Sequence, residues 1–349
     1  WMDEHTIGGD ADYVEAEVED NCFTEGTEYL TKNGWMPIEL ATMDDIAATV
    51  NMHTMTIEYQ KVISTTRYRY DGDVLHLYAG IESTPNHRIV GRFDGKDKFE
   101  IREANELYRG VRMLGCVENG YNGTLFDSPF PRRFTLSDWA EFLGWYISEG
   151  CAVGVGGGRK GSQIYISQNP GEKRDRIRKL LELMRLPVHE RKGDLWFSDT
   201  DIHKHLFPLG SSEKKYIPEY VFEYPQSIQK VFYQAMVDGD GDGKNRYFTT
   251  SARLADDMQR LLTLMGFRSS LATQKQSQNG FSKGSTKILY RVYRASEKHI
   301  YVEHKPKPTH YKGEVSCVTV PNGVIIVRAK GKPMIVGNCR IHGVRGILE

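Results

Sequence analysis

The sequence has few cysteines, no long apolar run and no excess charge, and each absence excludes a class of protein. Its cysteines are five in number and widely scattered: Cys22, Cys116, Cys151, Cys317 and Cys339. An odd, scattered set argues against a disulfide framework and favours free thiols in a reducing, cytoplasmic compartment. No stretch approaches the roughly 18 apolar residues of a membrane helix, and the first residues lack the basic and apolar regions of a secretory signal. We therefore expect no membrane partner.

The formal net charge is zero, with 46 basic and 46 acidic residues, which disfavours a protein that only binds polyanions. The balance is uneven, because residues 1–21 hold eight acids and no Lys or Arg. Residues 22–338 hold 37 acids against 44 bases, and the basic residues cluster between 132 and 312. Such clusters are either solvated faces or a nucleic-acid surface, and the sequence leaves both open.

The hydrophobic pattern changes period twice along the chain. From Cys22 to about Val90, short alternating runs broken by Gly, Asn and Asp predict an all-β segment. From about Ser137 the apolar residues fall at helical spacing, and a mixed α/β segment continues to about residue 300. Alternating β runs return in 315–320 and 324–327. The pattern therefore predicts a β domain interrupted by an α/β insertion.

The insertion contains an internal repeat. Residues 142–150 form an apolar segment ending in Glu149-Gly150, followed by a strand and an amphipathic helix. Residues 233–241 form a second such segment ending in Asp240-Gly241, again followed by a strand and a helix. Such a duplication predicts a monomeric, pseudo-two-fold domain in which Glu149 and Asp240 meet on the axis.

The two apolar segments resemble the paired signature of LAGLIDADG homing endonucleases, over about residues 135–300. Small residues such as Gly144 and Ala235 would let the two helices approach closely. The resemblance implies that Glu149 and Asp240 bind Mg²⁺, which would assist cleavage of double-stranded DNA at the site in a host gene copy that lacks this segment. Candidate DNA-binding residues are Arg159, Lys160, Lys173, Arg174, Lys214 and Lys215. The alternative is an inserted domain that is only a DNA-binding or structural module.

Three blocks in the β segments resemble an intein, a protein-splicing element with an all-β, horseshoe-like Hint fold. Residues 22–34 match its opening block, Thr84-Pro85-Asn86-His87 its T-x-x-H block, and 331–339 its closing block, with Asn338 before Cys339. The implied domains are an N-extein fragment at 1–21, splicing-domain parts at 22–130 and 304–338, an endonuclease domain at 131–303, and a C-extein fragment at 339–349. A free-standing endonuclease with an idle β domain is a competing hypothesis, which the presence of all these blocks disfavours.

The resemblance implies a role for each of these residues. Cys22 performs an N-to-S acyl shift at the Asn21–Cys22 bond, because a thiolate is both a nucleophile and a leaving group. His87 hydrogen-bonds and protonates the scissile nitrogen, while Thr84 holds the distorted geometry. Cys339 then attacks the thioester, Asn338 cyclises and cuts the chain, and an S-to-N shift joins Asn21 to Cys339. No cofactor is needed for splicing.

The chain departs from the commonest intein pattern before its closing residues. Gly337 stands where a histidine usually assists asparagine cyclisation, and Ile325 lies near where a further histidine is common. Cys317 replaces a frequent aspartate; it would assist the thioester step or serve as an extra branching nucleophile. The host stays open: Trp1-Met2-Asp3-Glu4 resembles the end of a Walker B strand in a microbial or phage P-loop ATPase, such as a terminase.

Overall fold

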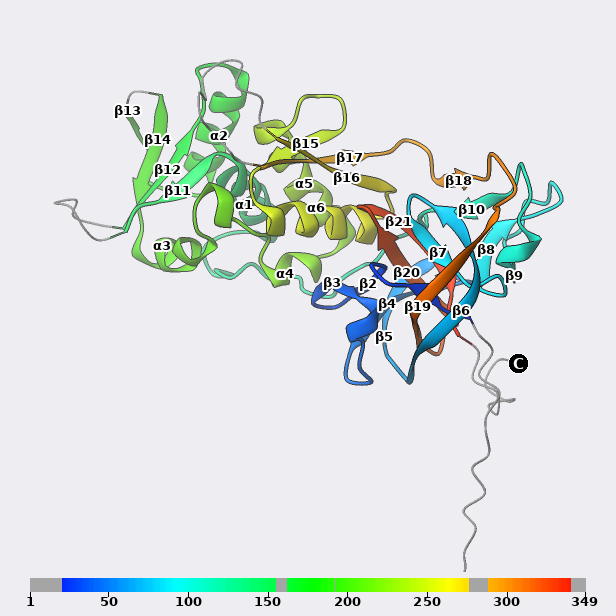
Figure 1. The fold of residues 1–349 in the computed structure, drawn as a ribbon. Coiled ribbons are helices and arrows are strands. Elements are labelled where there is room, and N and C mark those ends of the chain that lie inside the picture. Colours follow the sequence, from blue (N-terminus) through cyan, green and yellow to red (C-terminus); the bar gives the residue numbers. More distant parts are fainter. Residues whose placement is uncertain (1–20, 155–161, 192, 276–287, 340–349) are drawn as a thin grey trace, which may run out of the picture.

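The computed structural model describes residues 21–154, 162–191, 193–275 and 288–339 (Figure 1). Strands from the two ends of the sequence lie together on one side of the molecule, and the green-to-yellow helices lie on the other. The N-terminal strands are β1 (Phe23–Thr24), β2 (Glu28–Thr31), β3 (Gly34–Pro37), β4 (Ile46–Asn51), β5 (Thr56–Lys61), β6 (Ser64–Tyr78), β7 (Ile81–Ser83), β8 (Arg88–Arg92), β9 (Glu100–Glu103) and β10 (Arg112–Leu114). The C-terminal strands are β18 (His299–Tyr301), β19 (Pro308–Thr319), β20 (Val324–Ala329) and β21 (Lys332–Gly337).

These strands form two groups that interleave the two ends of the chain. Strands β1, β19, β6 and β7 pair in a closed cycle, and a ten-stranded sheet runs β18-β10-β8-β21-β20-β2-β4-β5, with β3 paired to β2 and β9 to β8. Strand β21 thus lies between β8 and β20. The alternating pattern that predicted strands at both ends of the sequence is confirmed, and neither end forms its sheets alone. Because β18 pairs with β10, the return to the β unit begins before residue 304.

The segment between the β strands is α/β. Its helices are α1 (Leu136–Glu149), α2 (Glu172–Leu183), α3 (Thr200–Leu206), α4 (Glu219–Phe222), α5 (Gln226–Asp240) and α6 (Ala252–Leu264). Its strands are β11 (Gly150–Ala152), β12 (Gln163–Ser167), β13 (His189–Arg191), β14 (Asp194–Ser198), β15 (Arg246–Thr249), β16 (Ser269–Lys275) and β17 (Ile288–Arg294). Short 3-10 helices occupy Ile38–Leu40, Ala104–Glu106, Phe207–Leu209 and Ser212–Lys214.

The internal repeat is visible in the sheet order of this segment. The first sheet runs β11-β12-β14-β13, and the second runs β15-β17-β16, with an extra bridge from Gly241 to Tyr247 beside β15. That bridge corresponds to the Gly150–Ile166 pair of β11 and β12. Each half of the internal repeat therefore has a helix, one or two strands, a second helix and a β-hairpin, in that order.

Helices α1 and α5 pack directly against each other at positions occupied by small residues. A Cβ on Gly144 would lie 2.6 Å from the Phe232 carbonyl oxygen and 2.7 Å from the Ala235 Cβ. A Cβ on Gly239 would lie 2.5 Å from the Ser148 Cβ. These distances are too short for any larger residue, so the close packing expected at Gly144 and Ala235 is present.

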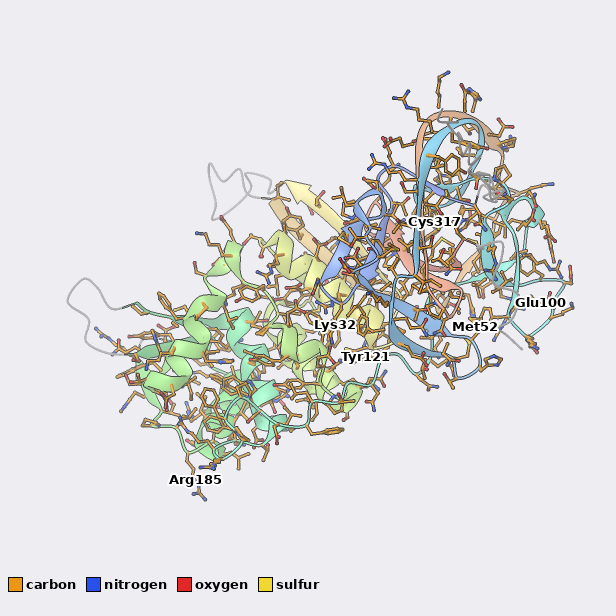
Figure 2. All side chains as sticks on the ribbon, turned by 90° about the horizontal axis from the view of Figure 1, so that it is seen from below. Lys32, Met52, Glu100, Tyr121, Arg185 and Cys317 are labelled. Carbon is orange, nitrogen blue, oxygen red and sulfur yellow. The ribbon has the colours of Figure 1, made fainter. Side chains whose placement is uncertain are left out.

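Two buried arginines join the α/β segment to the β unit. Arg328 of β20 pairs with Glu28 at 2.7 Å and with Asp256 of α6 at 2.7 Å. Arg260 of α6 pairs with Glu219 and donates to the Lys32 carbonyl oxygen. Figure 2 shows Lys32 at the junction of the two parts, while Cys317 lies within the β part. Among the residues that the structure describes, no helix is long and apolar enough to cross a membrane.

Candidate functional site

The two blocks that bound the predicted intein meet inside the β unit. Strand β1 pairs with β7 through Phe23 and Ser83, which places Cys22 beside the turn that carries Thr84 and His87. Strand β21 ends at Gly337, and Asn338 and Cys339 follow it. Every one of the predicted splicing residues is at most 3% exposed: Cys22, Thr84, His87, Cys317, Asn338 and Cys339. The site is therefore shielded from bulk water.

The carbonyl group of Asn21 lies at the centre of this site. Its oxygen is 3.0 Å from the Cys339 sulfur and 3.1 Å from His87 Nδ1. A carbonyl oxygen only accepts hydrogen bonds, so Nδ1 of a neutral His87 is the protonated ring nitrogen. The nitrogen on the other side of the scissile bond, Cys22 N, donates to Thr84 Oγ1 at 3.1 Å.

This placement differs from the sequence expectation for His87. The sequence pattern assigned His87 to the scissile nitrogen, but the imidazole contacts the carbonyl oxygen and the Thr84 hydroxyl contacts the nitrogen. The reason is the turn after β7, in which the His87 N–H donates to the Thr84 carbonyl oxygen and the His87 ring packs against Phe23 at 4.1 Å.

Burial determines the protonation state of His87. Desolvation lowers its pKa to about 4, although the nearby Cys339 and Asn21 carbonyl oppose the shift. The imidazole is therefore neutral at pH 7, and its Nδ1–H can polarise the Asn21 carbonyl without carrying a charge into the site.

Two further cysteine thiols, those of Cys22 and Cys317, lie near Cys339. The sulfurs of Cys22 and Cys339 are 3.9 Å apart, and Cys317 lies opposite Thr66 in the β6–β19 pairing. Hydrogen bonds from the Cys22 and Cys317 thiols lower the pKa of Cys339. Burial, together with the adjacent Cys339, raises the pKa of Cys317. Cys339 is thus the thiol that ionises first of this pair, and Cys317 remains a hydrogen-bond donor.

Asn338 forms hydrogen bonds with the turn between β19 and β20. Its Nδ2 donates to the Val320 carbonyl oxygen at 2.9 Å, and its backbone N–H donates to the Gly323 carbonyl oxygen at 3.0 Å. The carboxamide is therefore fixed next to the Asn338–Cys339 bond, where cyclisation would cut the chain.

A second site lies where α1 and α5 end. Glu149 and Asp240 are close enough to repel each other. Burial is the largest cause that raises the pKa of Asp240 to about 7, and the charge of Glu149 is the second. Burial also raises the pKa of Glu149, whose Oε1 accepts from Gln168 at 3.2 Å. The two helix ends lie close together, since a Cβ on Gly239 would lie 3.3 Å from Glu149 Cγ. A shared site of Glu149 and Asp240 on the repeat axis stays a prediction.

Lys215 supplies the positive charge near this carboxylate pair. Its Nζ donates to the carbonyl oxygens of Tyr146, Ile147 and Gly150 at 2.6–3.0 Å, at the C-terminal end of α1. Burial lowers its pKa to about 8, and Asp240 and Glu149 oppose the shift.

The residues expected to contact DNA separate into three groups. Lys173 and Lys214 are exposed, and Lys173 Nζ donates to the Asp238 carbonyl oxygen. Arg174 and Lys215 are buried, at 7% and 5% exposed, so they differ from the expectation of a DNA-facing side chain. Arg174 is buried because α2 turns it inward to pair with Glu190 at 3.1 Å. Arg159 and Lys160 lie outside the described residues, as do residues 1–20 and 340–349.

No protein-family model matches the chain. The ATP-dependent Clp protease proteolytic subunit of Chlamydomonas moewusii is 22% identical over 339 residues, covering 85% of this chain and 34% of that protein. The DNA-directed RNA polymerase subunit beta C-terminal section of Stigeoclonium helveticum is 21% identical over 406 residues. That alignment covers 93% of this chain and 37% of the polymerase section. The ribonucleoside-diphosphate reductase subunit beta of Aquifex aeolicus is 23% identical over 396 residues. That alignment covers 94% of this chain and 51% of the reductase subunit. The chain thus spans about a third to a half of the length of these relatives.

Two solved structures are similar at low TM-score. The AceL NrdHF class 3 split intein, a splice-inactive variant, has a TM-score of 0.34 and 12% identity, covering 91% of this chain and 99% of its own. The bacterial intein-like domain from Clostridium thermocellum has a TM-score of 0.24 and 27% identity, covering 27% of this chain and 66% of its own.

Proposed function

We propose that this chain is a self-splicing element, which excises residues 22–338 and joins Asn21 to Cys339. The observation that carries the proposal is the convergence of two cysteine sulfurs, 3.9 Å apart, on the carbonyl group of Asn21. Acyl transfer between two thiols requires both of them within reach of one carbonyl, and a buried site keeps water from intercepting the thioester.

In the first step, the Cys22 sulfur attacks the Asn21 carbonyl carbon. A C–S bond forms, the C–N bond breaks, and the thiol proton ends on the released amine of Cys22. His87 Nδ1–H, 3.1 Å from the carbonyl oxygen, stabilises the negative charge that develops there. The Thr84 hydroxyl holds the scissile nitrogen in place.

In the second step, the Cys339 thiol takes the acyl group and Cys22 leaves as a thiol. The 3.0 Å contact between the Cys339 sulfur and the Asn21 oxygen supports this transfer. Asn338 then cyclises: its Nδ2 bonds to its own carbonyl carbon, the bond to the Cys339 nitrogen breaks, and the Nδ2 proton ends on the released amine. That amine takes the acyl group from sulfur, which leaves an ordinary peptide bond.

The curated relatives support the same proposal. A protease subunit, a polymerase section and a reductase subunit share no activity in their names, yet each is aligned with 85–94% of this chain and with only 34–51% of its own length. A segment shared by such different proteins fits an element that leaves its host after translation, in a reducing cytoplasm.

Thiol-induced cleavage tests the first step. Dithiothreitol added to the purified Asn338→Ala variant should release residues 1–21, because a strong external thiol displaces the Cys22 thiol from its thioester. The Cys22→Ala, Asn338→Ala double variant should stay intact, since it lacks the atoms for both the acyl shift and cyclisation. Equal cleavage of the two variants would contradict the proposal.

We propose a second activity for the α/β segment: Mg²⁺-dependent cleavage of double-stranded DNA, with the intein-free host gene as substrate. The adjacent carboxylates of Glu149 and Asp240 support it, because their mutual repulsion suits them to a shared divalent cation. No cluster of three or more His, Cys, Asp or Glu suited to a metal occurs among the described residues. The protein would thus supply two ligands, and DNA phosphates and water the others. Bound Mg²⁺ would polarise the phosphate and lower the pKa of a water.

Digestion of the intein-free allele tests this activity. Asp240→Asn should abolish Mg²⁺-dependent cutting and leave salt-sensitive DNA binding and splicing intact, because splicing uses another part of the chain. Cutting that persists in the Glu149→Gln, Asp240→Asn double variant would overturn the carboxylate assignment. Binding without cutting by the wild-type chain would favour the alternative of a DNA-binding or structural module.

A further inference from the structure

The residue before Asn338 has no side chain, and the sheet explains why. Strands β21 and β8 pair through Val336 and Ile89, which brings Gly337 opposite Arg88. A Cβ on Gly337 would lie 2.4 Å from the Arg88 Cβ and 3.0 Å from the Arg88 carbonyl oxygen. While the two strands stay paired, position 337 therefore holds no group that assists cyclisation.

The Arg88 guanidinium and the Asn338 carboxamide lie on the same side of the site, around Gly323. A methyl group on Gly323 would lie 3.7 Å from Arg88 Nη1 and 3.9 Å from Asn338 Oδ1. The guanidinium and the carboxamide oxygen thus border the same glycine. The charge of Arg88 also reaches the site from this side, since it is one of the causes that lower the pKa of His87.

The rest of the Asn338 carboxamide is already held by carbonyl groups. Its nitrogen donates to Val320 and the backbone N–H donates to Gly323. Both contacts use donors of Asn338, so neither withdraws electron density from the carboxamide oxygen. A cation next to that oxygen would polarise the amide and make the Nδ2 proton easier to lose.

We propose that Arg88 is a positioning residue for Asn338 cyclisation, with its guanidinium holding the carboxamide oxygen while Nδ2 attacks the main-chain carbonyl. This role rests on the splicing reaction proposed above and affects only its third step. Arg88 exchanges no proton: the Nδ2 proton still ends on the Cys339 amine, and the guanidinium stays charged throughout.

Separate measurement of the two cleavages tests the role in the full chain. Arg88→Ala should slow release of residues 339–349 by roughly tenfold or more, the effect of losing one charged hydrogen bond. The rate of dithiothreitol-induced release of residues 1–21 should change by less than about twofold, which is much less than the effect of losing one charged hydrogen bond. Arg88→Lys should restore part of the C-terminal rate, and millimolar methylguanidinium should do so for Arg88→Ala.

Arg92→Ala is the matched control. Arg92 lies four residues further along β8 and packs over Phe99 at 4.5 Å, away from Asn338. Its removal should leave both cleavages unchanged and show no response to methylguanidinium. An unchanged C-terminal rate in Arg88→Ala, or an equal loss of both cleavages, would overturn the role of Arg88. A wild-type chain that releases neither peptide would instead overturn the splicing proposal itself.

Discussion

The sulfur of Cys339 lies 3.0 Å from the carbonyl oxygen of Asn21, although 318 positions separate the two residues in the sequence. The contact brings together the two residues that splicing would join, before any bond between them exists. It follows from β1 and β21 belonging to one β unit, whose strands come from both ends of the described chain.

This contact leads to a prediction about Cys339 and Cys22. Cys339→Ala should abolish ligation while dithiothreitol still releases residues 1–21, because the Cys22 thioester forms first. Cys22→Ala should abolish ligation as well, since Cys339 receives the acyl group from Cys22. Peptide mass spectrometry of both variants checks this. Ligation that survives in Cys22→Ala would mean that Cys339 attacks the Asn21 carbonyl directly.

The protonation state of His87 gives a pH prediction. Burial lowers its pKa to about 4, so the neutral donor form is present throughout pH 6–8. Thiol-induced N-terminal cleavage should show no inflection near the ordinary histidine value of about 6.5. His87→Ala should slow it by about 100-fold or more, as for loss of one hydrogen bond to a developing oxyanion. His76→Ala is the control, because His76 is exposed and pairs with Glu82; equal slowing there would contradict the assignment.

Cys317 is predicted to act on the branched intermediate. Its thiol donates toward Cys339 and helps to lower the pKa of that sulfur. Cys317→Ala removes this hydrogen-bond donor and should raise the pKa of Cys339, so the branched species should accumulate more slowly while N-terminal cleavage still occurs. Gel densitometry over time measures both. Splicing kinetics identical to the wild type would show that Cys317 is only a packed core thiol.

The carboxylate pair predicts a pH-dependent stability. The pKa of Asp240 in the folded chain is about 7, above the ordinary aspartate value of 3.8. The folded state therefore binds this proton more tightly, and its contribution is lost as the pH rises through about 7. Asp240→Asn should raise the Tm at pH 8 and change it little at pH 5, whereas Mg²⁺ should stabilise only the wild type. A Tm gain of equal size at both pH values would contradict this.

Asp238→Asn is the matched control for that experiment. Asp238 lies two residues earlier on α5 and pairs with Arg176 at 2.7 Å. Because the substitution removes this ion pair, it should bring no Tm gain at pH 8.

The junction of the two parts gives a stability prediction. Arg328 is 4% exposed and pairs with both Glu28 and Asp256. Arg328→Ala leaves two carboxylates without their buried partner, and we expect a loss of about 3–5 kcal/mol in the free energy of unfolding. Arg67→Ala, which breaks an exposed pair with Glu314, should cost far less, because solvent screens that pair. Urea denaturation compares them; equal losses would contradict a structural junction.

The sequence predicted most of the elements and the residues that bound the site, because both depend on local signals. The period change near Ser137 marked the start of α1, whose N-cap is Thr135. The repeated acid-Gly endings predicted that Glu149 and Asp240 meet. These are properties of short segments or of a duplication, and they need no knowledge of long-range pairing.

Long-range contacts could not be predicted in the same way. Lys215 reads as a surface lysine, but the end of α1 supplies three carbonyl oxygens that bind its ammonium in the interior. Arg88 follows His87 directly and carries no motif of its own; only the β8–β21 pairing places it opposite Gly337, the residue before Asn338. Thr66 likewise contributes to the thiol site only because β6 pairs with β19.

The mass spectrum of the purified wild-type product under reducing conditions tests the central claim most directly. The account predicts two species: residues 22–338 ending in a succinimide, lighter by one water than the free acid, and one peptide that joins residues 1–21 to residues 339–349. The succinimide should regain that water as it hydrolyses. A single chain of all 349 residues after prolonged incubation would contradict the claim that this protein excises its own middle.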